Sequence, residues 1–257
     1  MSFDLQIHQP PRERAAHCAT HGPYTSKCYL RNIWLGCSAC IQQKQAAEMA
    51  EQVRQQERMC LQEWRSKLER AAIPPRFQDR SLDNFTATTP AQQAALQFAT
   101  EYAKNFVQVR STGRCALFLG KPGTGKTHLA TAIGLHAMHK HHAKVVFTTV
   151  LRAVRMVKDS WGRGARISES QAIATMVAPD LLILDEVGVQ FGSEFEKHIL
   201  FDVLNERYEL RRPTLLLSNL TLAEVRAFVG ERVMDRISED GGAVVPFTWD
   251  SYRRPAA

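Results

Sequence analysis

Short apolar runs alternate with segments of helical spacing along residues 74–257. Four runs, over 115–119, 144–150, 178–184 and 214–217, are mostly apolar and of strand length. Such runs are typical of strands that are buried on both faces of a parallel sheet. The segments before and between them predict helices over 90–107, 128–134, 151–158 and 194–210. The pattern therefore predicts an α/β fold, with a parallel sheet flanked by helices.

The first third of the chain has a different pattern. Residues 41–73 contain neither Gly nor Pro and are rich in Ala, Gln, Glu and Arg, which predicts one long helix. Its apolar residues form a thin stripe. Either this stripe packs along a helix of a partner, or the segment is a solvated helix that only connects its neighbours. Pro74 and Pro75 end this helix. The chain is predicted to divide into an N-terminal module over 1–40, a helical linker or docking helix over 41–73, and a domain over 74–257.

Residues 120–127 carry the strongest functional motif. They read Gly-Lys-Pro-Gly-Thr-Gly-Lys-Thr and match the phosphate-binding pattern G-x-x-x-x-G-K-[ST] at every fixed position. An apolar run precedes this P-loop and a helical segment follows it, as the motif requires. The expected nucleotide-binding residues are Gly120, Lys121, Pro122, Gly123, Thr124, Gly125, Lys126, Thr127 and His128.

The P-loop motif predicts ATP and Mg²⁺ as ligands. Glycines let the backbone wrap around an oligophosphate, so that N–H groups and the positive end of the following helix face the anion. Lys126 is expected to reach the β- and γ-phosphates. The hydroxyl of Thr127 is expected to hold Mg²⁺.

Two carboxylates follow the apolar run that begins at residue 178. We interpret this run as a Walker B strand, in which Asp185 orients Mg²⁺ and Glu186 polarises the water that attacks the γ-phosphate. An adjacent Asp-Glu pair favours ATP hydrolysis over transfer of the phosphoryl group. Asn219 ends the next predicted strand, where it would contact the attacking water or the γ-phosphate, or would be a simple turn residue. These residues predict an ATPase.

Four of the six cysteines lie between residues 18 and 40. The pairs Cys18 with His21 and Cys37 with Cys40 have the spacing of a closed tetrahedral zinc site. We expect these four residues to bind Zn²⁺, although Cys28 or His17 could replace one of them, and reduced cysteines in a disordered tail are the alternative. Four protein ligands leave no open position for a substrate. The site therefore predicts a docking module, which zinc holds folded.

Positive charge gathers around the predicted helix 151–158. The chain has 33 Lys and Arg against 26 Asp and Glu, a balance that suits a polyanionic partner without proving one. Three cations recur at a step of three residues, and two more follow. They are either an ordinary solvated face or a contact for a nucleic-acid backbone. The candidate DNA-binding residues are Arg152, Arg155, Lys158, Arg163 and Arg166.

The sequence contains no apolar run of about 18 residues, the minimum for a transmembrane helix. The first residues also lack the basic and apolar regions of a signal peptide. We therefore expect a cytoplasmic protein without a membrane partner.

The P-loop, the Asp-Glu pair and Asn219 occur in the order found in AAA+ ATPases, which this sequence resembles. Three further motifs resemble the bacterial DnaC-type replicative helicase loaders: Gly188-Val189-Gln190, the segment Gly-Glu-Arg-Val-Met-Asp-Arg at 230–236, and Trp-Asp-Ser-Tyr-Arg at 249–253. The resemblance covers residues 74–254. It implies an AAA+ core, and the sequence after residue 236 leaves no room for the helical lid that many AAA+ proteins add.

The resemblance also implies self-association, because in AAA+ proteins one subunit completes the ATP site of the next. Segment 230–236 resembles the box that carries the arginine finger. We expect Arg236 to be the finger and Arg232 to be an interface or sensing residue, unless both pair with Glu231 or Asp235 within their helix. Residues 150–170 correspond to an insertion that contacts single-stranded DNA in initiator and loader ATPases.

The function that the resemblance implies is helicase loading. Such a protein binds the replicative DNA helicase hexamer, delivers it onto single-stranded DNA, and is released when ATP is hydrolysed. The N-terminal zinc module and the long helix would grip the helicase. Two alternatives remain: the IstB-like helper ATPase of a transposition system, and an adaptor that binds nucleotide without hydrolysing it.

Overall fold

The structure is a computed structural model that describes residues 11–30, 32–188 and 194–253. Val189 and Gln190 of one loader-like motif, and residue 254 at the limit of the resemblance, lie outside the described residues. The chain divides into two compact units, Met1–Arg65 and Ser66–Ala257. The division falls inside the predicted linker, because Leu68, Ala71 and Ile73 are buried in the second unit.

The first unit is built on an antiparallel hairpin that the sequence pattern did not predict. Strand β1 (Arg12–Cys18) pairs with β2 (Gly22–Leu30), and the short β3 (Ile33–Trp34) pairs with the other edge of β2. The buried side chains that the structure describes between residues 11 and 65 are those of Ser26, Cys28 and Cys37. So small a core needs an additional constraint to stay folded.

Helix α1 (Ser38–Arg70) begins three residues before the predicted start at residue 41 and ends before residue 73. The chain leaves the helix where Ala72 adopts a left-handed backbone conformation, at φ 52°. Leu68 is the buried residue of this helix, and the other apolar residues of α1 are exposed or half-buried. Within the described chain, no helix is both long and apolar enough to cross a bilayer.

The second unit contains a five-stranded parallel sheet with the order β5-β6-β7-β4-β8. The α/β prediction is therefore confirmed. Strand β8 was not predicted, because it contains Pro246. As β8 is an edge strand, it tolerates a residue without an N–H group. The strands are β4 (Ala116–Gly120), β5 (Val145–Thr149), β6 (Leu181–Asp185), β7 (Thr214–Ser218) and β8 (Ala243–Phe247).

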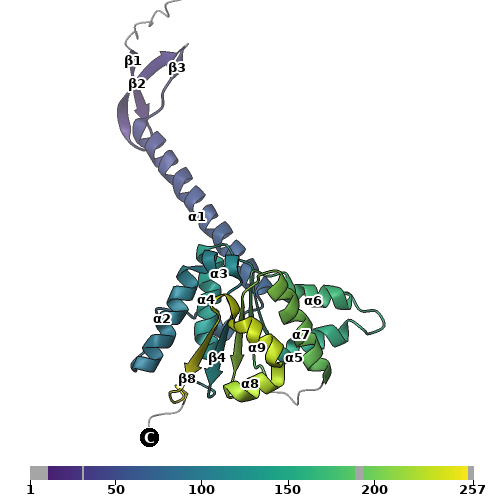
Figure 1. Cartoon of the computed structure of the whole chain (residues 1–257). Coiled ribbons are helices and arrows are strands. Elements are labelled where there is room, and N and C mark those ends of the chain that lie inside the picture. Colours follow the sequence, from purple (N-terminus) through teal and green to yellow (C-terminus); the bar gives the residue numbers. More distant parts are fainter. Residues whose placement is uncertain (1–10, 31, 189–193, 254–257) are drawn as a thin grey trace, which may run out of the picture. The chain divides into compact units, whose positions relative to one another are not determined.

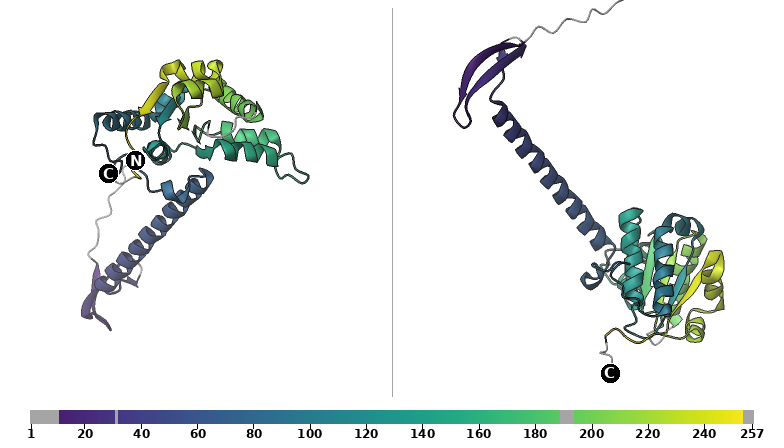
Figure 2. Two further views of the ribbon diagram at one scale, coloured as in Figure 1. Left: turned by 90° about the horizontal axis from the view of Figure 1, so that it is seen from below. Right: turned by 90° about the vertical axis from the view of Figure 1, so that its left-hand side faces the viewer.

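Helices cover both faces of this sheet, as Figures 1 and 2 show. Alternate strand residues such as Leu117 and Leu182 pack with α5 to α9 in one core. On the other face, Phe118 contacts Phe98 of α2, and α4 packs beside α2 against the sheet. The helices are α2 (Pro90–Lys104), α3 (Phe106–Thr112), α4 (Lys126–Lys140), α5 (Val150–Asp159), α6 (Glu169–Val177), α7 (Glu194–Glu209), α8 (Leu222–Val229) and α9 (Glu231–Ser238), with single 3-10 turns at Pro75–Phe77 and Glu239–Gly241.

The prediction of one helix over 90–107 is wrong at its end. Helix α2 stops at Lys104, and α3 starts at Phe106 after Asn105 leaves helical geometry at ψ 25°. The break lets Phe106 and Val109 turn toward the core. Tertiary packing decides this boundary, and helix propensity does not.

Arg207 of α7 lies fully inside the second unit. Its guanidinium donates hydrogen bonds to the carbonyls of Met176, Val177, Pro179 and Pro213 and to the hydroxyl of Thr214. Burial lowers the pKa of Arg207 to about 9, so the side chain stays charged at neutral pH. This side chain joins the end of α6 to the starts of β6 and β7.

Candidate functional site

A cavity of about 530 Å³ lies at the carboxyl ends of the parallel strands. Strand β4 ends there at Gly120, β6 ends at Asp185, and Asn219 follows β7. Ligands in open α/β sheets bind at this edge, and the volume is in the usual range of about 300–1,000 Å³ for ligand sites. The cavity is therefore the candidate functional site.

The P-loop forms the floor of the cavity between β4 and α4. Gly123 and Gly125 have φ values of 83° and 95°, which other residues rarely adopt. The Gly125 cap gives α4 no side-chain hydrogen bond, so the first N–H groups of the helix remain available to an anion. This geometry is suited to phosphate.

Lys126 is folded back onto its own loop. Its Nζ donates to the carbonyl oxygens of Gly120 at 2.5 Å and Lys121 at 2.9 Å. Burial lowers the pKa of Lys126 to about 8, although the Asp185 carboxylate opposes the shift. An anionic ligand would restore the lost solvation of this ammonium group.

Thr127 and Asp185 meet at the base of the cavity. The Thr127 hydroxyl donates to Asp185 Oδ2 at 2.9 Å, and the Glu186 N–H donates to Oδ1 at 2.8 Å. Burial raises the pKa of Asp185, while both hydrogen bonds work against that rise. A hydroxyl beside a carboxylate is the kind of hard oxygen donor set that Mg²⁺ prefers, so the residues present fit this ion.

Glu186 and Asn219 also line the cavity. The backbone of Glu186 is left-handed, with φ 62°, which is uncommon outside glycine and often marks a functional position. The next residue holds this turn in place, since the Val187 N–H donates to Leu217 O at 2.9 Å. The structure thus brings Glu186 and Asn219 to the same cavity as Lys126, Thr127 and Asp185.

One wall of the cavity comes from residues ahead of the P-loop, which sequence reasoning did not assign. Arg76, Arg80 and Phe85 line it. His128 is tied to this wall through Nε2, which lies 3.0 Å from Ser81 O, and its ring contacts Phe85 edge-on. Burial lowers the pKa of His128, so the neutral ring is favoured at neutral pH.

Segment 249–253 closes another side of the cavity and grips the P-loop. Trp249 Nε1 donates to Thr124 O at 2.9 Å, and the Tyr252 N–H donates to Gly123 O at 3.0 Å. A Cβ atom on Gly123 would collide with Ser251 Oγ. Arg253 lines the cavity near Lys126. The loader-like motif in the sequence marked this segment, but nothing in it indicated these contacts.

The two predicted finger residues project from α9 onto α7, and neither lines the nucleotide cavity of its own chain. Arg232 lies 5.8 Å over the Phe201 ring, and Arg236 lies 4.6 Å over the Tyr208 ring. Glu231 pairs with Arg226, at 2.8 Å, so it is not the partner of either residue. Among the described residues, the buried Nη1 of Arg236 has no hydrogen-bond partner.

The five predicted DNA-binding residues are all exposed, but the structure gathers only part of the set. Arg152, Arg155 and Arg166 line a cavity of about 380 Å³ beside α5. Lys158 lies 5.4 Å from the Phe195 ring instead. Each step of three residues falls about 60° short of a full helical turn, so Lys158 is rotated away from Arg152. Arg163 is exposed in the loop after α5.

In the first unit, the ligand atoms of Cys18, His21, Cys37 and Cys40 lie within 4.8 Å of one another. The Cys18 and Cys40 sulfurs are 3.4 Å apart, and His21 Nδ1 is 3.3 Å from the Cys40 sulfur. Bonds of about 2.3 Å to sulfur and 2.0 Å to nitrogen give edges of about 3.5–3.8 Å in a tetrahedral zinc site. The four residues therefore fit Zn²⁺. Of the two possible substitutes, neither Cys28 nor His17 belongs to this cluster.

The cysteines of this cluster differ in acidity. N–H groups of His21 and Thr20 lower the pKa of Cys18 to about 6, and the Cys18 thiolate then raises the pKa of Cys40 to about 11. Two thiolates at this distance repel each other unless a cation lies between them. A bound divalent cation would offset this repulsion.

Comparison with known proteins places the chain in a family. The model of the IstB-like ATP-binding protein family matches residues 41–256. The replicative helicase loader DnaC of Escherichia coli strain K12 is 37% identical over 186 residues, which cover 72% of this chain and 73% of DnaC. These matches confirm the resemblance read from the motifs.

Two solved structures establish the AAA+ fold. The crystal structure of the DnaC helicase loader aligns with a TM-score of 0.60 at 23% identity, over 67% of this chain and 99% of that one. The replication initiator DnaA bound to AMPPCP and single-stranded DNA aligns with a TM-score of 0.56 at 24% identity, over 69% of this chain and 51% of that one. With the P-loop cavity and these matches, the chain belongs to the family of IstB-like ATP-binding proteins, as a member of the DnaC type.

Proposed function

We propose that this protein is an ATP-driven loader that binds a replicative DNA helicase and delivers it onto single-stranded DNA. The observation that carries the ATP-driven part is the contact between Thr127 and Asp185 in a P-loop cavity that Glu186 also lines. The loading part rests on the likeness to DnaC of Escherichia coli, a replicative helicase loader.

The residues of the cavity have separate tasks in hydrolysis. The N–H groups at the start of α4 bind the phosphates, and Lys126 exchanges its two carbonyl partners for the β- and γ-phosphates. Thr127 and Asp185 would hold Mg²⁺, which would neutralise charge on the phosphates. Glu186 takes a proton from the attacking water, and Asn219 orients that water.

Self-association completes the site. Arg236 reaches the γ-phosphate of a neighbouring subunit, where arginine fingers accelerate hydrolysis by about 10³ to 10⁵. Its Nη1 is buried without a hydrogen-bond partner among the described residues, so the side chain would turn outward to make that contact, with Arg232 serving the interface beside it. Hydrolysis then removes the γ-phosphate, breaks the contact and releases the loader.

The remaining sites bind the partners. Arg152, Arg155 and Arg166 contact the backbone of single-stranded DNA, with Lys158 and Arg163 beside them. Cys18, His21, Cys37 and Cys40 would bind Zn²⁺ and so hold the first unit in the shape that docks the helicase.

The test is capture of the purified replicative helicase of the same replicon by the full chain, with ATP or ADP present. We expect capture with ATP and none by a version that begins at Ser66. Glu186→Gln should keep ATP binding and capture, yet lose about 10²- to 10⁴-fold in hydrolysis and fail to release the helicase. If the full chain captures no helicase with either nucleotide, the loading role is wrong.

The family match supports a second candidate, the helper ATPase of a transposition system. Such a protein would bind duplex DNA and a transposase in place of single-stranded DNA and a helicase. Preference for duplex over single strands in a competition assay, together with failure to capture the helicase, would favour this function. A non-hydrolysing adaptor is the third reading, in which Glu186→Gln would leave function unchanged.

A further inference from the structure

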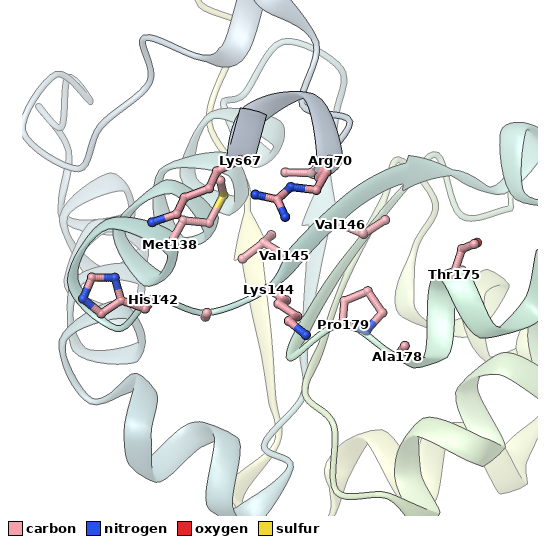
Figure 3. Close-up of a pocket in the computed structure, with 12 residues that line it drawn as sticks. Lys67, Arg70, Met138, His142, Lys144, Val145, Val146, Thr175, Ala178 and Pro179 are labelled. Carbon is pink, nitrogen blue, oxygen red and sulfur yellow. The ribbon is translucent and has the colours of Figure 1, made fainter. Parts of the chain in front are cut away.

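A second cavity of the Ser66–Ala257 unit, of about 480 Å³, lies at the edge of the sheet opposite the nucleotide cavity. Figure 3 shows its walls: Lys67 and Arg70 extend from the last turn of α1 near Val145 and Lys144, and Thr175 lies on the far side. Its position at the starts of the strands separates it from the ATP site. None of the functional residues discussed above lines it.

Positive charge surrounds this cavity without a counter-charge. Lys67, Arg70, His142 and Lys144 line it, and no acidic side chain does. Among the described residues, Lys67, Arg70 and Lys144 make no ion pair. Asp180 follows the lining residue Pro179 in the sequence, and its carboxylate already has partners. It accepts a hydrogen bond from the Lys144 N–H at 2.8 Å and forms an ion pair with Arg110 at 3.3 Å.

The rest of the lining is apolar except for Thr175, and it contains no Phe, Tyr or Trp. Ala71, Met138 and Val145 are buried around the cavity. A nucleobase would find no Phe, Tyr or Trp on which to stack. The lining therefore fits a ligand with anionic groups and small apolar faces, such as a sugar–phosphate backbone.

One hydrogen bond connects the lining of this cavity with the lining of the cavity beside α5. The Thr175 hydroxyl donates to Met156 Sδ at 3.4 Å, and Met156 lines the α5 cavity together with Arg152 and Arg155. The edge strand β5 connects the two places, since Lys144 precedes it and α5 follows it. At about 3.3 Å per residue, Lys144 before this strand and Val150 after it are on the order of 20 Å apart.

We propose that the cavity formed around Lys67, Arg70 and Lys144 is a second binding site for the sugar–phosphate backbone of single-stranded DNA. The strand continues from the α5 cavity, crosses Thr175 and enters the second cavity, where the two lysines and the arginine contact its phosphates. This proposal rests on the DNA-binding role of α5 proposed above. An acidic protein segment would match the charge, but the contact between Thr175 and Met156, which links this cavity to the arginines beside α5, favours the nucleic acid.

The test measures binding of a fluorescein-labelled oligothymidylate to the full chain over a range of salt concentrations. The cavity variant is Lys67→Ala/Arg70→Ala/Lys144→Ala. A charge-matched control, Lys104→Ala/Lys197→Ala/Arg226→Ala, removes the exposed cations Lys104 of α2 and Arg226 of α8 and the half-buried Lys197 of α7. A third variant, Arg152→Ala/Arg155→Ala, tests the α5 cavity alone. Melting temperature and ATP affinity report whether each variant is folded.

For single strands, the logarithm of affinity falls with the logarithm of salt at about 0.7 per phosphate contact. The cavity variant should therefore lose about 2 from this slope and at least about tenfold in affinity at low salt, while the control keeps the wild-type slope. If the cavity variant has the same DNA affinity and salt slope as the control, the proposal is wrong. If the cavity variant binds DNA normally and loses only helicase capture, the proposal is also wrong, and the cavity would instead bind an acidic protein segment. If the α5 variant binds normally while the cavity variant does not, the α5 role is wrong and the cavity site stands. No binding by the wild-type chain would reject both.

Discussion

At the scale of single residues, burial in the nucleotide cavity disfavours the charged forms of two side chains, and a bound ligand would offset this cost. Lys126 keeps its ammonium group where burial lowers its pKa to about 8, and burial also raises the pKa of Asp185. Glu186 adopts a left-handed backbone beside them. Each of these states is unfavourable in the free protein. They are therefore the features to test by substitution.

Replacing the charge of Lys126 should stabilise the free protein. The pKa of Lys126 is lowered on folding from 10.5 to about 8, so between these values the unfolded chain binds more protons and stability rises with pH. We expect Lys126→Met to raise the melting temperature at pH 7 and to abolish ATP binding, with a stability gain that shrinks toward pH 10. Lys140→Met, an exposed lysine of α4, should show neither effect. A lower melting temperature for Lys126→Met at pH 7 would contradict this account.

The local part of the site could be predicted because the residues that act together are close in sequence. The P-loop needs eight consecutive residues, and Asp185 and Glu186 end one apolar run. The wall formed by segment 249–253 could not be predicted, because Trp249 reaches Thr124 across a separation of 125 residues. Only the folded sheet, with β8 beside β4, brings these residues together.

The Trp249 hydrogen bond should therefore matter for nucleotide affinity. Trp249→Phe keeps an aromatic ring but removes the donor to Thr124 O, a bond of about 0.5–1.5 kcal/mol. We expect ATP affinity to fall about 2- to 10-fold, because the P-loop loses a support. Trp161→Phe, which removes the donor to Glu169 far from the P-loop, is the matched control. Equal ATP affinities for both variants would argue against a supporting role.

At the scale of elements, the strands were predictable where both faces are buried, as in β4, β6 and β7. Strand β1 reads Arg-Glu-Arg-Ala-Ala-His-Cys, which has neither an apolar run nor a clean alternation, so nothing indicated the hairpin. The ends of α1 and α2 depended on Ala72 and Asn105, whose conformations follow from tertiary packing. Nothing in the sequence indicated that Arg207 is buried, because it lies in a helix with many charged residues.

Arg207 should be the most sensitive charged side chain in the second unit. Arg207→Ala removes five hydrogen bonds and leaves the carbonyls of α6 and of the loops before β6 and β7 without partners in a buried place. We expect a loss of about 3–5 kcal/mol in the free energy of unfolding, measured by urea denaturation. The exposed neighbour Arg211 is the control, and Arg211→Ala should cost less than about 0.5 kcal/mol. A similar cost for both would show that the buried network contributes little.

At the scale of the whole molecule, the two units should respond separately to metal removal. The first unit has little core besides the Cys18, His21, Cys37 and Cys40 cluster, whereas the second has a complete one. We expect one zinc per chain, and a chelator should unfold the first unit while ATP binding persists. Cys37→Ser should abolish zinc binding, and Cys60→Ser, on the exposed part of α1, should not. Absence of metal in protein purified without chelator would contradict the zinc assignment.

The position of Arg236 on α9, outside the cavity of its own chain, leads to a prediction about assembly. Lys126→Ala disables the site of its own subunit, whereas Arg236→Ala disables the site of its neighbour if the finger acts between subunits. Each variant alone should be inactive. In an equimolar mixture, a head-to-tail interface pairs an intact Lys126 with an intact Arg236 about one time in four, so hydrolysis should return to about a quarter of the wild-type rate. Mixing Lys126→Ala with Arg232→Ala tests the other arginine in the same way. A mixture that associates but stays inactive would mean that Arg236 acts within its own subunit or does not act on ATP.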